Sequence, residues 1–215
     1  MTKTAYYGEK SVAYGMSHTR LERILEFIPR NRALRVLDVG CASGRLGQEI
    51  KKFGHFVVGI EISSQAAQNA RQALNEVYVF DVEGEWPRDL KKQKFDIVVL
   101  PEILEHIFDP VEVLRDVSRV LQDNGEIIIT TPNFMVWTNR LRFLIGDFAY
   151  REQGMFDFGH IRWFTYRYLR EVLGQSGFQI IHERHIIFPG KLGSILKYWP
   201  SIFAFQFVLR AKKII

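Results

Sequence analysis

Short apolar runs alternate with segments of helical periodicity through the first 131 residues of the chain. Five of these runs have the length and the Val/Ile/Leu content of buried strands, at residues 34–39, 56–62, 77–81, 95–101 and 126–131. The segments between them place apolar side chains at helical spacing, at residues 45–53, 64–74 and 109–121. Strands joined by helical crossovers pair in parallel, and near-continuous apolar strands are covered on both faces. The pattern therefore predicts a doubly wound α/β sheet.

The alternation of apolar runs and helical segments stops after the fifth predicted strand. Residues 134–164 are rich in aromatic and arginine side chains and lack a clear period. Long connections of this kind are often functional, so we expect a lid insertion over an acceptor site. A helix is expected at residues 165–175. Residues 177–187 and 202–211 look like two strands with no helical pattern between them, which indicates an antiparallel hairpin at one edge of a seven-stranded, mostly parallel sheet.

The composition agrees with one folded domain. The 215 residues are 47% apolar, and we expect residues 1–215 to form a single domain with residues 1–30 as an N-terminal arm and helix. No apolar run reaches the ~18 residues of a membrane span, and the N-terminus has no apolar signal stretch. Cys41 is the only cysteine, and together these features favour a cytoplasmic location. The net charge of +5 is scattered, so nucleic acid is not an expected partner.

The turn after the first strand is built from small residues. The stretch VLDVGCASGRLG contains Gly40, Ala42 and Gly44, which let a ligand approach the backbone closely. In doubly wound sheets the ligand lies beyond the carboxyl ends of the strands, where such a turn leads into a helix. Glu61 stands at the end of the second strand, and its carboxylate could accept two hydrogen bonds from a ribose diol. These features predict a ligand that contains adenosine.

Asp38 distinguishes between the adenosine-containing ligands. A nicotinamide dinucleotide favours the pattern G-x-G-x-x-G, whereas this chain has a carboxylate before the glycines, in D-x-G-x-A-x-G. That carboxylate would oppose a pyrophosphate and would suit an ammonium group. S-adenosylmethionine (SAM) carries an amino group and a sulfonium and has no phosphate.

The chain resembles the class I SAM-dependent methyltransferases, which have a Rossmann-like fold. The resemblance rests on VLDVGCASGRLG, VVGIEIS, VFDVE, FDIVVLPEILEHI and GEIIITTPN, which follow the order and spacing of the family's motifs over about residues 30–210. It is similar to the small-molecule type, including ubiquinone-precursor O-methyltransferases and methionine-biosynthesis methyltransferase-like proteins. Many relatives have glycine at the position of Ala42.

The resemblance implies a set of cofactor-binding residues for SAM, with S-adenosylhomocysteine as product. The methionine part would lie in the turn, the ribose on Glu61, and the adenine against Ile62 and Val82. Asp81 would accept from the adenine amino group; a helix cap or an exposed turn acid is the alternative for it. The full set is Asp38, Gly40, Ala42, Gly44, Glu61, Ile62, Asp81, Val82, Pro101 and Glu102.

The acceptor is expected to be a small molecule methylated on a hydroxyl oxygen. Alignment supplies much of the catalysis at an activated sulfonium, and a hydroxyl gains further from a base. His106, after the fourth strand, and His160, in the lid, are the candidate bases, with structural roles as the alternative for both. Asn133 could orient the acceptor or only form a turn. The lid arginines, Arg140, Arg142, Arg151 and Arg162, could bind an anionic acceptor or could be solvated.

Other interpretations remain open at this point. The sequence shows no metal-ligand cluster, so no metal is expected. A methyltransferase-like regulator without activity and a nicotinamide-dependent oxidoreductase are the alternative functions. Residues 189–201 combine apolar side chains with lysine and could contact a membrane or a lipid-linked acceptor, although packing over the edge strands is the simpler interpretation. Tyr6, Tyr7 and Tyr14 could fold over the cofactor.

Overall fold

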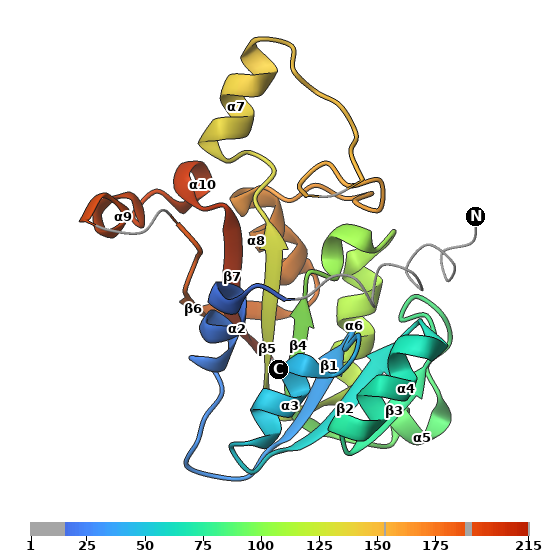
Figure 1. Ribbon diagram of the computed structural model, residues 1–215. Coiled ribbons are helices and arrows are strands. Elements are labelled where there is room, and N and C mark those ends of the chain that lie inside the picture. The colour runs from blue at the N-terminus through green and yellow to red at the C-terminus, as the bar shows by residue number, and fades with distance from the viewer. Residues whose placement is uncertain (1–15, 153, 188–190, 215) are drawn as a thin grey trace.

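The computed structural model describes residues 16–152, 154–187 and 191–214. Within these residues one seven-stranded sheet has the order β3-β2-β1-β4-β5-β7-β6 (Figure 1). Its strands are β1 (Arg35–Val39), β2 (Phe56–Glu61), β3 (Glu76–Val79), β4 (Phe95–Pro101), β5 (Leu121–Pro132), β6 (Phe178–Glu183) and β7 (Gln206–Lys213). The first five are parallel, and β7 is antiparallel to both β5 and β6. The predicted doubly wound sheet with an antiparallel edge is confirmed.

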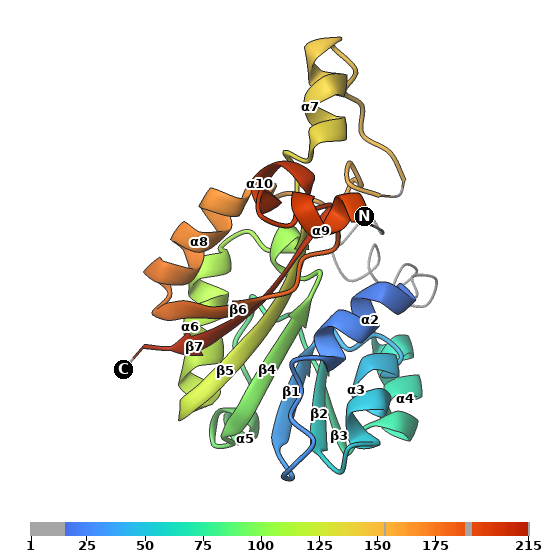
Figure 2. The same ribbon diagram turned by 90° about the vertical axis from the view of Figure 1, so that its left-hand side faces the viewer.

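Helices cover both faces of the sheet. One face carries α2 (His18–Leu25), α3 (Arg45–Lys51) and α4 (Ser64–Ala73), and the other carries α6 (Pro110–Val120) and α8 (Tyr166–Gln175) (Figure 2). The short α5 (Arg88–Lys91) contacts α6. The remaining helices are η1 (Leu104–His106), α7 (Trp137–Leu144), α9 (Lys191–Leu196) and α10 (Pro200–Phe203). No helix among the described residues is both long enough and apolar enough to cross a membrane.

Side-chain caps start two of the crossover helices, α4 and α6. Ser63 Oγ accepts from the Ala66 N–H at 3.3 Å at the start of α4, and Asp109 Oδ1 accepts from the Glu112 N–H at 3.1 Å at the start of α6. Pro110 occupies the first turn of α6, where a missing N–H costs nothing. These caps end the preceding loops at defined residues and so fix the strand–loop–helix junctions at the carboxyl edge of the sheet.

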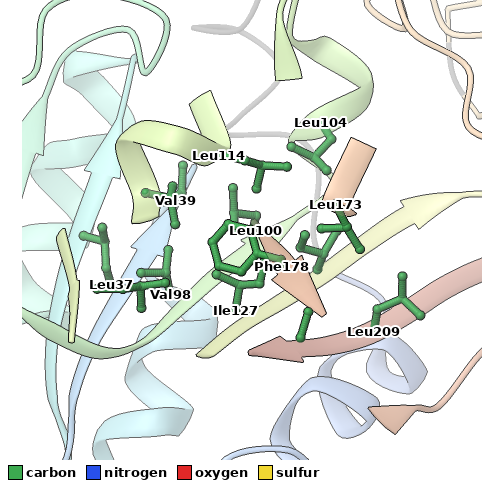
Figure 3. Packing of buried hydrophobic residues seen from close by; sticks show 14 of the residues in the cluster. Leu37, Val39, Val98, Leu100, Leu104, Leu114, Ile127, Leu173, Phe178 and Leu209 are labelled. Carbon is green, nitrogen blue, oxygen red and sulfur yellow. The ribbon is translucent and has the colours of Figure 1, made fainter. Parts of the chain in front are cut away.

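The core has two apolar layers separated by the sheet. Alternate residues of β1 point to opposite faces, so Leu37 and Val39 join the layer under α6 and α8, whereas Val36 joins the layer under α2 and α3. Figure 3 shows the first layer, in which Leu100 and Ile127 of neighbouring strands pack together. Because both layers are continuous clusters of closely packed apolar side chains, the strand ends that form the site are held rigidly.

Three boundaries in the last third differ from the prediction. The strand expected at 177–187 ends at Glu183, after which Ile186 makes one isolated bridge to Gln206. The strand expected at 202–211 begins at residue 206, because the chain forms α10 at Pro200–Phe203. The segment between the strands was expected to lack helix, yet it contains α9 and α10. They have six and four residues, too few to display a helical period in the sequence.

Two further differences lie around β5. The helix expected at 109–121 ends at Val120, and the strand expected at 126–131 already begins at Leu121, which pairs with Phe95 before the register shifts. The lid segment, which lacks a clear period, contains α7. Its residues Leu144 and Ile145 are each 81% exposed, so tertiary burial does not impose a repeating apolar face on it.

Gly59 in β2 tests the packing of the sheet against the turn after β1. A Cβ at residue 59 would lie 2.6 Å from Cys41 Sγ and 2.7 Å from Leu74 Cδ1. We expect Gly59→Ala to lower the free energy of unfolding by about 1–3 kcal/mol through overpacking. Gly174→Ala in α8 is the matched control, since nothing lies within 4 Å of its added Cβ, and it should raise stability by roughly 0.5 kcal/mol. Urea denaturation measures both, and equal midpoints would contradict the packing.

Candidate functional site

A cavity of about 670 Å³ lies at the carboxyl ends of the parallel strands. Its size is that of a pocket for a small molecule or cofactor. Of the twelve predicted site residues, all except Gly44 line it: Asp38, Gly40, Ala42, Glu61, Ile62, Asp81, Val82, Pro101, Glu102, His106 and His160. The prediction that these residues share one site is therefore supported by their placement.

The turn after β1 depends on left-handed backbone. Gly40 has φ +72°, and a Cβ there would lie 2.2 Å from Ile103 Cδ1. Ala42 also has a positive φ, of 46°, which costs a residue with a side chain roughly 1–2 kcal/mol. That conformation is the physical reason why glycine is favoured at this position. The Ala42 N–H donates to Glu61 Oε2 at 2.9 Å, and this bond helps to hold the conformation.

Gly44 serves the packing of the turn. It precedes α3 with φ +85°, and an added Cβ would lie 3.1 Å from Ala73 Cβ and 3.2 Å from Ala70 Cα of α4. It sits behind the cavity wall, so the structure places it as a spacer between α3 and α4. The neighbouring Cys41 is buried, and burial raises the pKa of its thiol, as befits a packing residue.

Glu61 joins the ends of β1 and β2. Its carboxylate is 4% exposed; Oε2 accepts from Ala42, and Oε1 accepts from the Ser63 N–H at 2.8 Å. Burial raises the pKa of this carboxyl, and the two N–H donors oppose the rise. Each oxygen has further acceptor capacity, so the carboxylate can receive hydroxyl groups from a ligand in the cavity.

Asp38 is a wholly buried carboxyl group beside the cavity. It is 0% exposed, and neither oxygen has a hydrogen-bond partner among the described residues. The nearby Gly47 N–H lowers its pKa without completing a hydrogen bond, while burial, and then the charge of Glu61, raise the pKa to about 7. Such a group is unfavourable in the free protein unless a cation meets it.

Residues that the sequence analysis did not single out also line the cavity. Arg20 of α2 forms an ion pair with Glu102 at 3.3 Å, and its Nε donates to Gln206 Oε1 at 3.3 Å. Glu102 has φ 56°, and its Oε1 accepts from Thr130 Oγ1 at 3.0 Å. The position of Arg20 depends on how α2 docks across the strand ends, and no local pattern in the sequence carries that information.

His106 and His160 form a pair although 53 residues separate them in the chain. Their ring centroids are 4.8 Å apart. His106 Nδ1 lies 2.8 Å from the Gly159 carbonyl oxygen, and His160 Nδ1 lies 2.9 Å from that of Met155. A carbonyl only accepts, so each Nδ1 carries the hydrogen and a neutral ring has its lone pair on Nε2.

Glu105 lies next to this pair. Its side chain is buried, with the residue 1% exposed; Oε2 accepts from Thr131 Oγ1 at 3.1 Å, and Oε1 has no hydrogen-bond partner in the described part of the chain. Burial, with the charge of Glu102 second, raises its pKa well above the usual value. Ligand atoms of Glu105, His106 and His160 all lie within 4.8 Å of one another. The sequence analysis found no such cluster, and the fold assembles one.

The lid segment divides into two parts. Gly154, Met155, Asp157 and His160 line the cavity, whereas the aromatic side chains pack on one another, with Phe134 and Trp163 stacked at 4.5 Å. α7 stands away from the body of the protein in both views (Figures 1 and 2). Residues 154–160 thus contain the part of the lid segment that borders the cavity.

The other lid candidates have structural partners. Asn133 Nδ2 donates to the Ala204 carbonyl at 2.8 Å, and its Oδ1 accepts from the Met135 N–H, so it forms a turn at the end of β5. Arg140 donates to the Met135 carbonyl and Arg162 to that of Phe108, both at the surface. Tyr6, Tyr7 and Tyr14 lie outside the described residues.

Comparison with known proteins decides the family. A family model described as a methyltransferase domain matches residues 13–183, which is most of the chain. The chain belongs to the methyltransferase domain family. Its motifs and its sheet order agree with those of the class I SAM-dependent methyltransferases, whose cofactor is SAM. The nicotinamide alternative is left without support.

The methyltransferase resembles named proteins at moderate identity. It is 32% identical over 130 residues to a "Ubiquinone biosynthesis O-methyltransferase" from Alkalilimnicola ehrlichii, covering 59% of this chain and 53% of that protein. A protein of the same name from Neisseria meningitidis is 34% identical over 108 residues, covering 47% and 45%. The chain therefore spans about half the length of these relatives. A SAM-dependent methyltransferase structure from Methanosarcina mazei matches with TM-score 0.64 at 21% identity, over 94% of this chain and all of that one, which shows the shared fold.

The residues present in the methyltransferase fit SAM. The unpartnered Asp38 carboxyl suits a cationic group, and the space that a Cβ at Gly40 would fill suits a close ligand. Backbone N–H donors hold Glu61 at the carboxyl end of β2, where a ribose diol can reach its carboxylate. When bound, SAM supplies a methyl group activated by its sulfonium.

The raised pKa of Asp38 makes the stability of the free methyltransferase depend on pH. The folded form keeps its proton up to about pH 7, whereas the unfolded form loses it near 3.8, so stability falls as pH rises between these values. We expect the wild type to lose about 2–3 kcal/mol more than Asp38→Asn between pH 5 and pH 8. Urea unfolding at both pH values measures this. The exposed acid of α5 supplies the control, Asp89→Asn, which should behave as the wild type; matching losses in Asp38→Asn would contradict the assignment.

Proposed function

We propose that this protein transfers a methyl group from SAM to a hydroxyl oxygen of a small-molecule acceptor. The observation that carries the proposal is the continuity of one cavity, which runs from Glu61 and the glycine turn to His106 and His160. The names of the curated relatives, which are O-methyltransferases, support oxygen as the methylated atom.

The cofactor half of the proposed site lies along the ends of β1 and β2. Glu61 accepts hydrogen bonds from the ribose hydroxyls, and the half-buried Ile62 and Val82 lie beside the adenine. Asp81 receives the adenine amino group in addition to the Glu83 N–H, which it already accepts at 3.1 Å. Pro101 and Glu102, at the end of β4, border the methionine end. The buried Asp38 compensates the ammonium charge.

The acceptor half lies between η1 and the lid. Its walls combine apolar side chains, Ile107, Met155 and Phe205, with the two imidazoles. Such a surface suits an acceptor with an apolar or aromatic body and one hydroxyl directed at His106 and His160. The imidazole Nε2 atoms accept a hydrogen bond from that hydroxyl and so aim its oxygen at the methyl carbon. Positioning of this kind supplies much of the rate in a displacement at an activated carbon.

The first test is the binding of the cofactor product. We expect S-adenosylhomocysteine to bind with an affinity that falls up to about tenfold per pH unit below pH 7, because Asp38 must release its proton to meet the ammonium group. Glu61→Gln should weaken binding about tenfold or more, since one carboxylate oxygen is replaced by an amide that cannot accept. Calorimetry measures both effects, and Asp89→Asn is the control. An absence of binding at pH 8 would overturn the proposal.

The second test is the transfer itself. Incubation with SAM and a panel of phenols, aliphatic alcohols and matched amines, read by mass spectrometry, should show methylation of a hydroxyl compound. His106→Ala and His160→Ala should each lower kcat about 100-fold and leave the affinity for S-adenosylhomocysteine unchanged. His182→Gln, on the exposed edge strand β6, is the control. Methylation of amines alone would reject oxygen as the target, and binding without any transfer would favour the non-catalytic alternative.

A further inference from the structure

We propose that Glu105, His106 and His160 form a binding site for a divalent transition-metal ion at the acceptor end of the cavity. The three side chains come from η1 and from the lid, which meet only in the folded protein. The role given to the ion rests on the proposed function, whereas binding of the ion does not and can be measured without SAM.

The geometry is close to that of a bound ion. The candidate ligand atoms lie within 4.8 Å of one another. Two ligands of a tetrahedral zinc ion, each at about 2.1 Å, are about 3.4 Å apart, so small side-chain rotations would close the site. The backbone around it is fixed, since the Glu105 carbonyl accepts from the Ile161 and Arg162 N–H groups at 3.0 Å each. This contact ties the lid next to His160 directly to η1.

Both imidazoles are oriented as metal ligands usually are. A ligating histidine typically donates its second ring N–H to a carbonyl or carboxylate, which fixes the tautomer. His106 donates from Nδ1 to Gly159, and His160 donates from Nδ1 to Met155. In the neutral rings the coordinating lone pairs are therefore on the two Nε2 atoms.

Glu105 supplies a second, independent indication of a bound cation. Its Oε1 is buried and lacks a hydrogen-bond partner among the described residues, although a buried carboxyl oxygen normally has one. Thr131 Oγ1 donates to the other oxygen and orients the group, as an outer-shell partner does. Arg20 balances the charge of Glu102, so the Glu105 carboxyl contributes one negative charge to the site once a bound cation displaces its proton.

The donor set favours particular ions. Two imidazole nitrogens and one carboxylate oxygen suit Zn²⁺, Co²⁺ or Ni²⁺, whereas Mg²⁺ prefers oxygen ligands. Three protein ligands leave at least one coordination position open, as in catalytic metal sites. The acceptor hydroxyl would occupy that position, next to the proposed methionine end of the cofactor.

The ion would act as a Lewis acid on that hydroxyl. Coordination lowers the pKa of the hydroxyl, whose proton leaves to water. The oxygen then forms a bond to the methyl carbon of SAM while the carbon–sulfur bond breaks, and its electron pair stays on sulfur. The products are the methyl ether, S-adenosylhomocysteine and the released proton. His106 and His160 serve as ligands in this scheme in place of general bases.

The test uses the tag-free full chain and Co²⁺ or Zn²⁺ alone. Co²⁺ should produce visible absorption bands of a coordinated ion, and calorimetry should show one equivalent of Zn²⁺ bound. His106→Ala, His160→Gln and Glu105→Gln should each weaken binding about 100-fold or more, since loss of an outer-shell partner already costs about 10–100-fold. Thr131→Val should weaken it about tenfold. His182→Gln should leave it unchanged, and Mg²⁺ should compete poorly.

The outcomes separate this proposal from the proposed function. Circular dichroism and S-adenosylhomocysteine binding check that each variant is folded; if one ligand variant fails to fold, the nitrogen NMR shifts of His106 and His160 on adding Zn²⁺ to the wild type decide. Absence of these shifts, or equal Zn²⁺ affinity in the wild type and the ligand variants, overturns the metal site. Metal binding without S-adenosylhomocysteine binding overturns the proposed function instead. Full methylation activity after chelation would assign the two imidazoles to general-base catalysis and would reject the role of the ion.

Discussion

The ends of β1 and β2 are held together by one carboxylate. Glu61 accepts from Ala42 at 2.9 Å and from Ser63 at 2.8 Å, so a single side chain fixes both the left-handed turn after the first strand and the start of the helix after the second. These bonds offset the strain of the positive φ at Ala42. The turn residues Gly40 and Ala42 and the carboxylate of Glu61 are thereby held together at one end of the cavity.

The fold accepts unfavourable groups in order to form this site. Asp38, Glu61 and Glu105 are all buried acids whose pKa values are raised by burial. A core built only for stability would place apolar residues at such positions. Two apolar layers on either side of the sheet supply the stability that allows these acids to remain. Burial destabilises the charged form of these carboxyl groups, and a bound cationic ligand would stabilise it.

The acceptor half is organised by a different contact. The Glu105 carbonyl joins η1 to the lid through two N–H donors, and this places His160 beside His106. The lid segment thus borders the cavity through its short return segment, and its aromatic cluster, which includes Phe156 of that return, packs around Phe134 and Trp163. The projecting α7 joins this aromatic cluster through Phe143, whose ring centroid lies 5.2 Å from that of Phe134, and its exposed apolar end contributes nothing to the cavity.

The sequence by itself determined the parallel sheet, its antiparallel edge and the cofactor turn. Buried strands, crossover helices, Gly40 and the acid at residue 61 are all visible in local patterns, because periodicity and small side chains act over a few residues. Only the tertiary structure decided the docking of Arg20 across the strand ends, the spacer role of Gly44 and the grouping of Glu105 and His106 with His160. These depend on the path of loops between distant segments, which no local pattern specifies. The short helices α9 and α10 were not predicted for the same reason. Helices of six and four residues are stabilised by the segments packed around them more than by their own sequence.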